Sequence, residues 1–371
     1  MLDSLISPPE GWFNSCGQNY LDIQDRGYYT PSDKKEVLIN NIDEGEEDMK
    51  RRIVMVILAV IVCAFMLASE GVASQLYSLG EVNGFALAQA SKDDGGVEKS
   101  AWEQRQEAEK VANQSGWAIL PHRPNYILPY TYNSSPNNAP YRAAGTDTEV
   151  DNAEAKFQIS FKLPIWEKMF GSKTDLFVAY SQIAMWQVYN DQSAPFRDTN
   201  YEPEAVVVFH PDFEILGLTN RAVAFGVVHQ SNGRGMDALS RSWNRVYVAV
   251  AFDRGNFACS IKPWWRIPED AKAYPGDPDG DNNPGIEKYY GYGEFRAAYK
   301  MGNNVFAMML RNNLRSSENK GAIELDWSFP LPFGSKLKGF VQYFNGYGET
   351  LIDYDAANQR VGVGILLSDW L

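Results

Sequence analysis

The residues of this 371-residue sequence with the clearest chemical potential lie in one stretch, Arg221 to Val250. Ser231 could act as a nucleophile, but its hydroxyl is barely ionised at neutral pH and needs a base beside it. His229 could take the Ser231 proton and later return it to the leaving group, while Asn244 could hold the imidazole in the productive tautomer. Gly233 has no side chain, so its backbone N–H could approach a developing oxyanion closely. Together these residue types predict an acyl-hydrolase site with a serine nucleophile.

Around these residues, apolar and polar side chains alternate with a period of two, which is typical of half-buried β-strands. Val227, His229 and Ser231 fall on one face, so His229 and Ser231 project side by side from the end of an apolar surface. Asn244 falls on the apolar face of the return strand, and because neighbouring strands lie about 5 Å apart it can lie beside His229. Polar catalytic groups on such a surface suit a substrate that comes from lipid, which predicts an interfacial lipid hydrolase. The competing interpretation is a hairpin end that meets water.

The same alternation recurs along the chain from Asn125 onward. Ile323, Leu325 and Trp327, for example, alternate with charged and small residues. Such segments lie near 125–132, 156–166, 174–189, 202–210, 214–231, 240–253, 256–267, 287–300, 303–311, 320–331, 335–347 and 358–371. An even number of long amphipathic strands predicts an all-β fold, a twelve-stranded antiparallel transmembrane β-barrel over residues 125–371 with its apolar face toward lipid. A secreted, soluble β-sandwich that binds glycans is the alternative.

Before the strands, the one uninterrupted apolar run, Ile53 to Ala68, follows three basic residues and precedes small and polar ones. The run is shorter than the roughly 20 residues of a spanning helix and has the layout of a secretory signal peptide. We therefore expect residues 1–48 to be a mis-called extension and 49–74 a signal peptide, with cleavage as late as residue 90. Residues 75–124 would form a short periplasmic segment. A single membrane anchor with a short cytoplasmic tail is the alternative.

Charge and composition exclude several classes of function. Acidic residues outnumber basic ones by 47 to 34, for a formal net charge of −13, whereas a nucleic-acid-binding protein needs a basic face. Three cysteines cannot build a disulfide framework, and three scattered histidines do not suggest a His-rich zinc site. Aromatic residues make up 13% of the chain, a content that suits the interfacial girdles of a membrane barrel as well as a soluble domain.

Several runs near the site carry a family resemblance, foremost HQSNGRG (229–235) and SRSWNRVY (240–247). Two further runs are SAPFRDTNYEP (193–203) and YFNGYGETLIDYDAANQRVGV (343–363). With these motifs the sequence resembles outer membrane phospholipase A, the calcium-dependent lipase family of Gram-negative outer membranes. The resemblance extends over residues 125–371.

The resemblance implies a calcium-dependent phospholipase A1/A2 that hydrolyses acyl ester bonds of phospholipids and lysophospholipids in the outer membrane. It implies Ser231 as the nucleophile, His229 as the general base and acid, and Asn244 as the residue that orients His229. It also implies an oxyanion hole formed by the Gly233 N–H and a calcium-bound water.

Calcium is the cofactor that the resemblance implies, and a homodimer is the active form. The ligands would be the Arg234 backbone carbonyl and the Ser240 hydroxyl of one chain, with Ser193 contributed by the partner chain. Oxygen ligands of this kind are those that a hard cation accepts. Asp237 is a secondary candidate ligand, although the Gly233–Ser240 loop is one residue longer than the family pattern and so departs from the family's spacing at that position.

Gln182 matches a polar position at the dimer interface of the family. Its parity with Tyr180 and Trp186 leaves open whether it faces the lipid or the barrel lumen. The main alternative to the enzyme is a catalytically silent outer-membrane barrel that serves as a pore or a scaffold.

Overall fold

The computed structural model of the chain describes residues 99–371, apart from 114–118, 147–148, 172, 192–194, 236–237, 275–276, 278 and 333–336. The predicted extension, the signal peptide and most of the predicted periplasmic segment therefore lie outside the described residues. Among the helices that the structure describes, none combines the length and the apolar content needed to cross a membrane.

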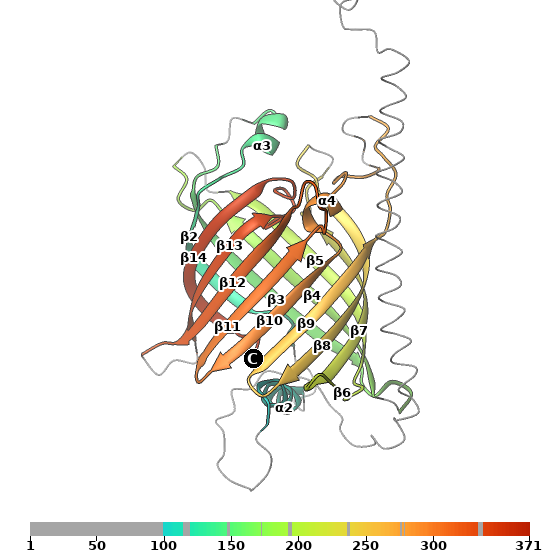
Figure 1. Cartoon of the computed structure of the whole chain (residues 1–371). Helices are drawn as coiled ribbons and strands as arrows, with labels where there is room; N and C mark the ends of the chain where they lie inside the picture. Colours follow the sequence, from blue (N-terminus) through green and yellow to red (C-terminus); the bar gives the residue numbers. More distant parts are fainter. Residues whose placement is uncertain are drawn as a thin grey trace, which may run out of the picture. The chain divides into compact units, whose positions relative to one another are not determined.

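Most of the described chain forms long antiparallel strands (Figure 1). Their bounds are β2 Asn125–Asn133, β3 Ala153–Trp166, β4 Thr174–Trp186, β5 Phe196–Phe209, β7 Leu218–Ser231, β8 Ser242–Arg254, β9 Phe257–Arg266, β10 Gly293–Met301, β11 Asn304–Asn312, β12 Gly321–Pro330, β13 Lys338–Tyr347 and β14 Ala357–Ser368. Two strands of two residues, β1 Leu120–Pro121 and β6 Glu214–Ile215, extend the ladders of β3 and β7. The long strands contain 9 to 14 residues, enough to span a bilayer when tilted.

The sheet closes on itself. Each long strand pairs with its neighbour in the sequence, β14 pairs with β2, and β3 pairs with both β2 and β4. Closure leaves none of the twelve strands with an unpaired edge, which is the condition for a β-sheet in hydrocarbon. The predicted twelve-stranded antiparallel barrel is thereby confirmed.

Two segment boundaries differ from the sequence prediction by six residues. Residues 287–290, predicted as the start of a strand, form the short helix α4, Glu287–Tyr290, and β10 begins only at Gly293. Strand β5 begins at Phe196, six residues before the predicted start, because Arg197, Asp198 and Asn200 are buried polar residues that interrupt the apolar alternation.

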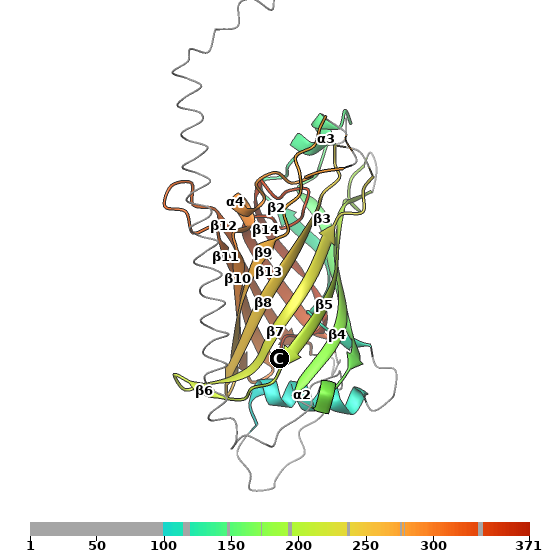
Figure 2. The ribbon, with the colours of Figure 1, turned by 90° about the vertical axis from the view of Figure 1, so that its right-hand side faces the viewer.

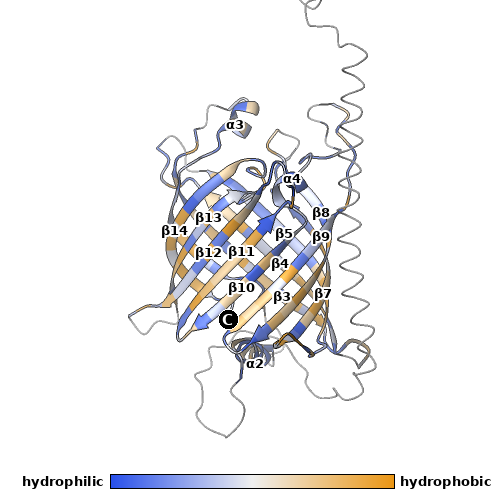
Figure 3. Ribbon diagram, in the orientation of Figure 1, coloured by the Kyte–Doolittle hydropathy of each residue, from blue (hydrophilic) through white to orange (hydrophobic). Residues whose placement is uncertain are grey.

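The two faces of the barrel differ sharply in polarity. Large apolar and aromatic side chains are exposed on the outer face, among them Ile127, Ile159, Leu163, Phe225, Val227, Ile261, Trp265, Phe306, Leu325, Trp327, Val361 and Val363. Charged and polar side chains are buried on the inner face, among them Glu154, Lys156, Gln158, Arg197, Glu202, Glu204, Arg245 and Arg360. Figure 3 shows the hydrophobic residues along the strands and the more hydrophilic loops beyond them. This inverted arrangement is that of a membrane barrel and excludes a soluble β-sandwich.

The two ends of the barrel also differ. At one end, strands are joined by short turns such as 255–256 and 302–303, and at the other by long loops such as 134–152 and 267–292. The long-loop end carries helices α3, Ala139–Ala143, and α4 (Figure 2). Outer-membrane barrels have short periplasmic turns and longer extracellular loops, so the long loops mark the outer-leaflet side.

Helix α2, Ala101–Asn113, lies at the short-turn end, on the opposite side from α3 and α4 (Figures 1 and 2). Salt bridges join it to the strands: Glu103 to Arg221 at 2.8 Å and Glu109 to Lys162 at 2.8 Å. Arg105 donates a hydrogen bond to the carbonyl of Asp369 near the end of the chain at 2.7 Å. These contacts fix α2 against this end of the barrel.

Candidate active site at the outer rim of the barrel

His229 and Asn244 are direct register partners on the paired strands β7 and β8. The Nδ1 atom of His229 lies 2.8 Å from Oδ1 of Asn244. His229 is exposed and Asn244 is half-buried. Their face continues the apolar outer surface, because Val227 and Phe225 precede His229 on that face and are exposed. The structure therefore places both groups on the outside of the barrel, next to the long-loop end.

The bond between these two side chains determines the tautomer of the imidazole. Asn244 Oδ1 can only accept, so His229 Nδ1 donates the proton of this hydrogen bond. In the neutral ring, Nε2 then carries the lone pair. His229 is thus held in the form that can take a proton from a neighbouring hydroxyl.

Ser231 lies two residues beyond His229 on the same face of β7. At the usual rise of a strand, the Cα atoms of the two residues are about 6.6 Å apart. Its register partners are Ser242 on β8 and Tyr201 on β5. Ser231 is half-buried, and within the described part of the chain no hydrogen bond engages its hydroxyl. Bonds between a nucleophile and its base commonly tighten only when substrate is bound. The hydroxyl is therefore free to take up that bond.

Gly233 begins the loop that follows β7 and has a φ of +65°. A side chain here would be strained in backbone conformation, and its Cβ would lie 2.7 Å from the ring of Tyr201. Glycine is therefore the residue that this position accepts. Within the described residues, the Gly233 N–H donates no hydrogen bond, so it can serve as an oxyanion donor.

The loop 232–241 is closed by Asn232, whose side chain is buried. Its Oδ1 accepts from the backbone N–H of Arg241 at 2.9 Å, and its Nδ2 donates to the carbonyl of Leu239 at 2.8 Å. Leu239 packs into a small apolar cluster with Tyr141 and Ile352 from two other loops. The loop is thus tied both to itself and to its neighbours.

Two of the predicted calcium ligands lie together in this loop. The hydroxyl of Ser240 donates to the backbone carbonyl of Arg234 at 3.3 Å, so both oxygens face the same small space. The described residues hold no group of three or more His, Cys, Asp or Glu side chains placed for a metal, but a carbonyl and a hydroxyl are ligands of another type. These two oxygens are of the kind that a hard cation such as calcium accepts. The other two candidates, Ser193 and Asp237, lie outside the described residues.

The structure resolves which way Gln182 faces. It pairs with Ile159 of β3 and with Tyr201 of β5, and directly opposite residues share a face of the sheet. Ile159 is exposed on the outer face, so Gln182 lies on that face too. The row of register partners continues from Tyr201 to Ser231. Gln182 is therefore on the lipid side, two strands from the candidate nucleophile.

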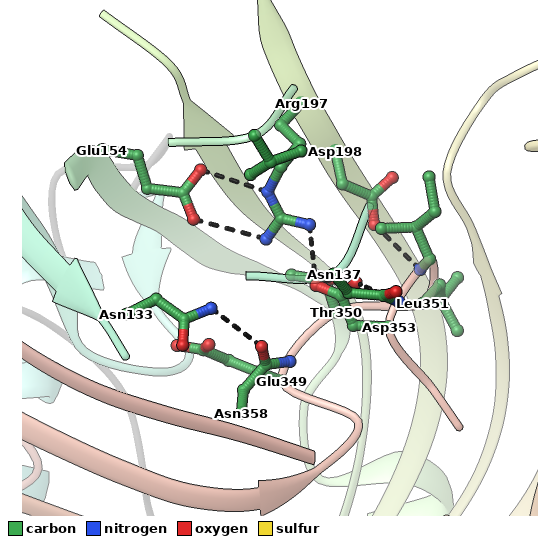
Figure 4. A network of polar contacts seen from close by, with 12 residues as sticks. Asn133, Asn137, Glu154, Arg197, Asp198, Glu349, Thr350, Leu351, Asp353 and Asn358 are labelled. Carbon is green, nitrogen blue, oxygen red and sulfur yellow. Dashed lines mark hydrogen bonds and ion pairs between the residues drawn. The ribbon is translucent and has the colours of Figure 1, made fainter. Parts of the chain in front are cut away.

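A network of charged and polar side chains joins strand ends to the loops at the long-loop end of the barrel (Figure 4). Arg197 donates to Asp353 at 2.7 Å and to Glu154 at 3.1 Å. The carbonyl of Arg197 in turn accepts from the Arg234 guanidinium at 2.9 Å, and Asp198 accepts from Asn232 at 3.2 Å. The network thus supports the loop that carries the candidate calcium ligands.

Glu269 is a neighbour of the site that the sequence analysis did not identify. It lies in the loop after β9, and its Oε1 accepts from Nδ2 of Asn244 at 3.2 Å. Burial raises the pKa of the Glu269 carboxyl, against the opposing effect of Arg266. No spacing in the sequence links residues 244 and 269. The signal arises only when the β8–β9 ladder brings the two together.

A closed barrel with an apolar outer face, long loops at one end and a Ser/His/Asn group on that face defines the class of outer-membrane barrels with a candidate hydrolase site. Residues 102–367 match the family model described as phospholipase A1. The phospholipase A1 of Klebsiella pneumoniae is 35% identical over 252 residues, covering 68% of this chain and 82% of that protein.

Solved structures give the same result. Outer membrane phospholipase A from Escherichia coli is 35% identical with a TM-score of 0.61, covering 68% of this chain and 93% of that one. An outer membrane phospholipase dimer with bound calcium from Salmonella typhi is 34% identical with a TM-score of 0.61 and the same coverage. The chain belongs to the phospholipase A1 family, which confirms the resemblance stated from its motifs. It is a β-barrel protein of the Gram-negative outer membrane.

Proposed function

We propose that this protein is a phospholipase that hydrolyses acyl ester bonds of phospholipids and lysophospholipids with a Ser231–His229–Asn244 triad. The observation that carries the proposal is the 2.8 Å contact between His229 and Asn244 on the outer face, on the same strand face as Ser231. The site borders exposed apolar side chains, so a lipid can present its ester bond without leaving the membrane interface.

The mechanism follows from the placement of each group. Ser231 Oγ attacks the ester carbonyl while His229 Nε2 accepts its proton, and Asn244 Oδ1 stabilises the imidazolium through the Nδ1–H bond. The Gly233 N–H donates to the developing oxyanion. The C–O bond then breaks, the departing alcohol takes the proton from His229, and the acyl group stays on Ser231. Water, activated by His229, releases the fatty acid and restores the serine.

We propose calcium as the cofactor, held by the Arg234 carbonyl and the Ser240 hydroxyl together with ligands from a second chain. When bound there, calcium would supply positive charge beside the oxyanion position. The two oxygens in the described part of the loop are fewer than the six to eight ligands that calcium takes, and a second chain could supply others. The Salmonella typhi relative was solved as a dimer with bound calcium. Gln182, on the outer face, is the proposed interface contact.

The proposal for the N-terminal region is export through a signal peptide at residues 49–74, with residues 1–48 absent from the mature protein. Segment 75–124 would then remain on the periplasmic side, where α2 closes the short-turn end of the barrel. Mass determination of the protein extracted from outer membranes would give the mature N-terminus. A mass that includes residues 1–48 would contradict this proposal.

Two observations disfavour the alternative of a pore. Helix α2 lies across the short-turn end and is bound there by ion pairs. The lumen is crossed by buried pairs such as Lys156 with Glu349 at 3.0 Å and Arg197 with Asp353 at 2.7 Å. An ion-conducting barrel needs a continuous aqueous path instead.

The experiment that tests the function measures fatty-acid release from phospholipid micelles by the folded protein in detergent, with calcium and with excess chelator. We expect calcium-dependent release by the wild type and none above background by Ser231→Ala. Ser242→Ala is the matched control, because Ser242 lies directly opposite Ser231 on the same face, and it should retain activity. Equal activity of Ser231→Ala and wild type, or activity in chelator, would refute the proposal. Conductance without lipolysis would favour the pore.

A further inference from the structure

The side-chain amide of Asn244 bridges two groups. Its Oδ1 accepts from His229 Nδ1 at 2.8 Å, and its Nδ2 donates to Glu269 Oε1 at 3.2 Å. The backbone of the same residue accepts from the N–H of Ile267 at 2.8 Å. The chain leaving β9 therefore follows β8 past Arg266 and delivers Glu269 to Asn244.

The chemistry of the bridge gives it a direction. An ionised carboxylate has acceptors and no donor, so it can contact Asn244 only through the N–H₂ group. This contact turns Oδ1 toward His229, which in turn requires the proton to be on Nδ1. A reversed amide would point N–H at the imidazole and hold the opposite tautomer, with a hydrogen on the nitrogen that must take the serine proton.

The surroundings of Glu269 leave its carboxylate available for this contact. The nearby guanidinium of Arg266 forms ion pairs with Asp281 and with Glu287, so its charge is engaged elsewhere. Among the described residues, Asn244 is the hydrogen-bond partner of the Glu269 side chain. Glu269 is half-buried, and partial burial strengthens such a charge-assisted bond relative to one in water.

We propose that Glu269 is a positioning residue that fixes the amide of Asn244 and thereby the catalytic tautomer of His229. The triad is then oriented by a chain of hydrogen bonds that begins at a fourth residue. The proposal rests on the proposed function of the triad. It assigns to Glu269 a role in the rate of the chemical step rather than in substrate affinity.

A series of substitutions at position 269 tests the direction of the amide. Glu269→Gln keeps an oxygen acceptor and should retain kcat to within about threefold. Glu269→Ala removes the acceptor and should lower kcat about tenfold, the effect of losing one charge-assisted hydrogen bond, with KM unchanged. Glu269→Lys offers only donors, which favour the reversed amide, and should lower kcat below the alanine variant.

A double-mutant cycle tests whether Glu269 acts through Asn244. In an Asn244→Ala background, Glu269→Ala should cause no further loss of kcat, because the group that it orients is absent. Asp270→Asn is the matched control. It removes a carboxylate from the next residue of the same loop, whose side chain is exposed, and should leave kcat and KM at wild-type values.

Three results would overturn the proposal: wild-type kcat in Glu269→Ala, a lysine variant as active as glutamate, or an equal loss from Glu269→Ala with and without Asn244. Each is distinct from failure of the proposed function, which would appear as absence of lipolysis in the wild type. Unfolding midpoints of all variants, measured in the same detergent, should agree, so that a loss of kcat reflects the site and not the fold.

Discussion

Two polar groups at the long-loop end of the barrel lie within one loop of each other and are built in opposite ways. On the outer face, His229 makes a single side-chain hydrogen bond, and Ser231 makes none with the described residues. Inside the barrel, the single side chain of Arg197 bonds to both Glu154 and Asp353. Arg360 joins Glu154 to Glu349, and these five residues are called the inner network. The outer group therefore has donors and acceptors that can bond to a substrate. The donors and acceptors of the inner network are instead paired with other groups of the protein.

The contrast shows how a membrane enzyme can expose reactive groups without losing its fold. Loop 232–241 connects the two regions, since Arg234 bonds to Arg197 of the inner network and Asn232 bonds to the adjacent residue, Asp198. The inner charges fix the loop, and the loop places Gly233 and the candidate calcium ligands at the outer rim. Substitutions in the two regions should therefore affect different measured quantities.

The largest expected effect is on activity from the outer group. His229→Ala removes the base and should reduce fatty-acid release about 10⁴-fold, while the free energy of unfolding changes by no more than about 0.5 kcal/mol. The two quantities are measured by lipolysis in micelles and by guanidinium titration followed by tryptophan fluorescence. A stability loss equal to that of an inner-network variant would abolish the distinction between the regions.

The next largest effect is on stability from the inner network. Arg197→Ala leaves Glu154 and Asp353 buried without this partner and should lower the free energy of unfolding by about 3–5 kcal/mol. Glu107→Ala is the control. The side chains of Glu107 and its partner Lys99 are 56% and 58% exposed, and such a surface pair contributes about 0–1 kcal/mol. Equal losses in both variants would show that burial does not set the strength of these pairs.

The link between the regions should show an intermediate effect. Ser240→Ala removes one of the two proposed calcium oxygens and should raise the calcium concentration for half-maximal lipolysis about tenfold, equivalent to about 1.4 kcal/mol of ion binding. Maximal activity at saturating calcium should be retained. A calcium titration that matches the wild type would remove Ser240 from the site.

The last prediction concerns pH and the inner network. Glu349 lies in the loop after β13, where burial acts to raise its pKa but Arg360 and Lys156 hold the pKa at about 2. Because the folded pKa lies below the unfolded value, its stabilisation is present above pH 4.5 and is lost as the pH falls toward 2. Guanidinium titrations at pH 7, 4.5 and 2.5 should show this decline, and Glu349→Gln should flatten it. A decline that is unchanged in Glu349→Gln would assign it to other groups.

Sequence pattern alone predicted most of the fold. Alternation marked every long strand, because in a barrel the outward residues must be apolar along the whole membrane crossing. The alternation did not predict the structure correctly outside the membrane crossing, where outward residues need not be apolar. The start of β5 was missed because Arg197 and Asp198 face an inner network, and α4 was missed because the residues 287–290 lie in a loop above the membrane crossing.

The candidate site was predictable to the extent that it lies on paired strands. The sequence shows which face of its strand His229 occupies and where Asn244 lies on the return strand. Because the two residues are register partners in the β7–β8 hairpin, these local features place their side chains in contact. Two parts were out of reach. Gln182 required the neighbouring strands to fix its face, and Glu269 depends on a long loop folding back along β8.

The most direct test of the account is to identify the nucleophile by covalent labelling. A long-chain alkyl fluorophosphonate should modify the wild-type protein in detergent with calcium, and mass spectrometry of its peptides should place a single adduct on Ser231. Ser231→Ala should remain unlabelled, and His229→Ala should label far more slowly because the base is absent. An adduct on another residue, or equal labelling of Ser231→Ala and the wild type, would contradict the assignment of Ser231 as the nucleophile.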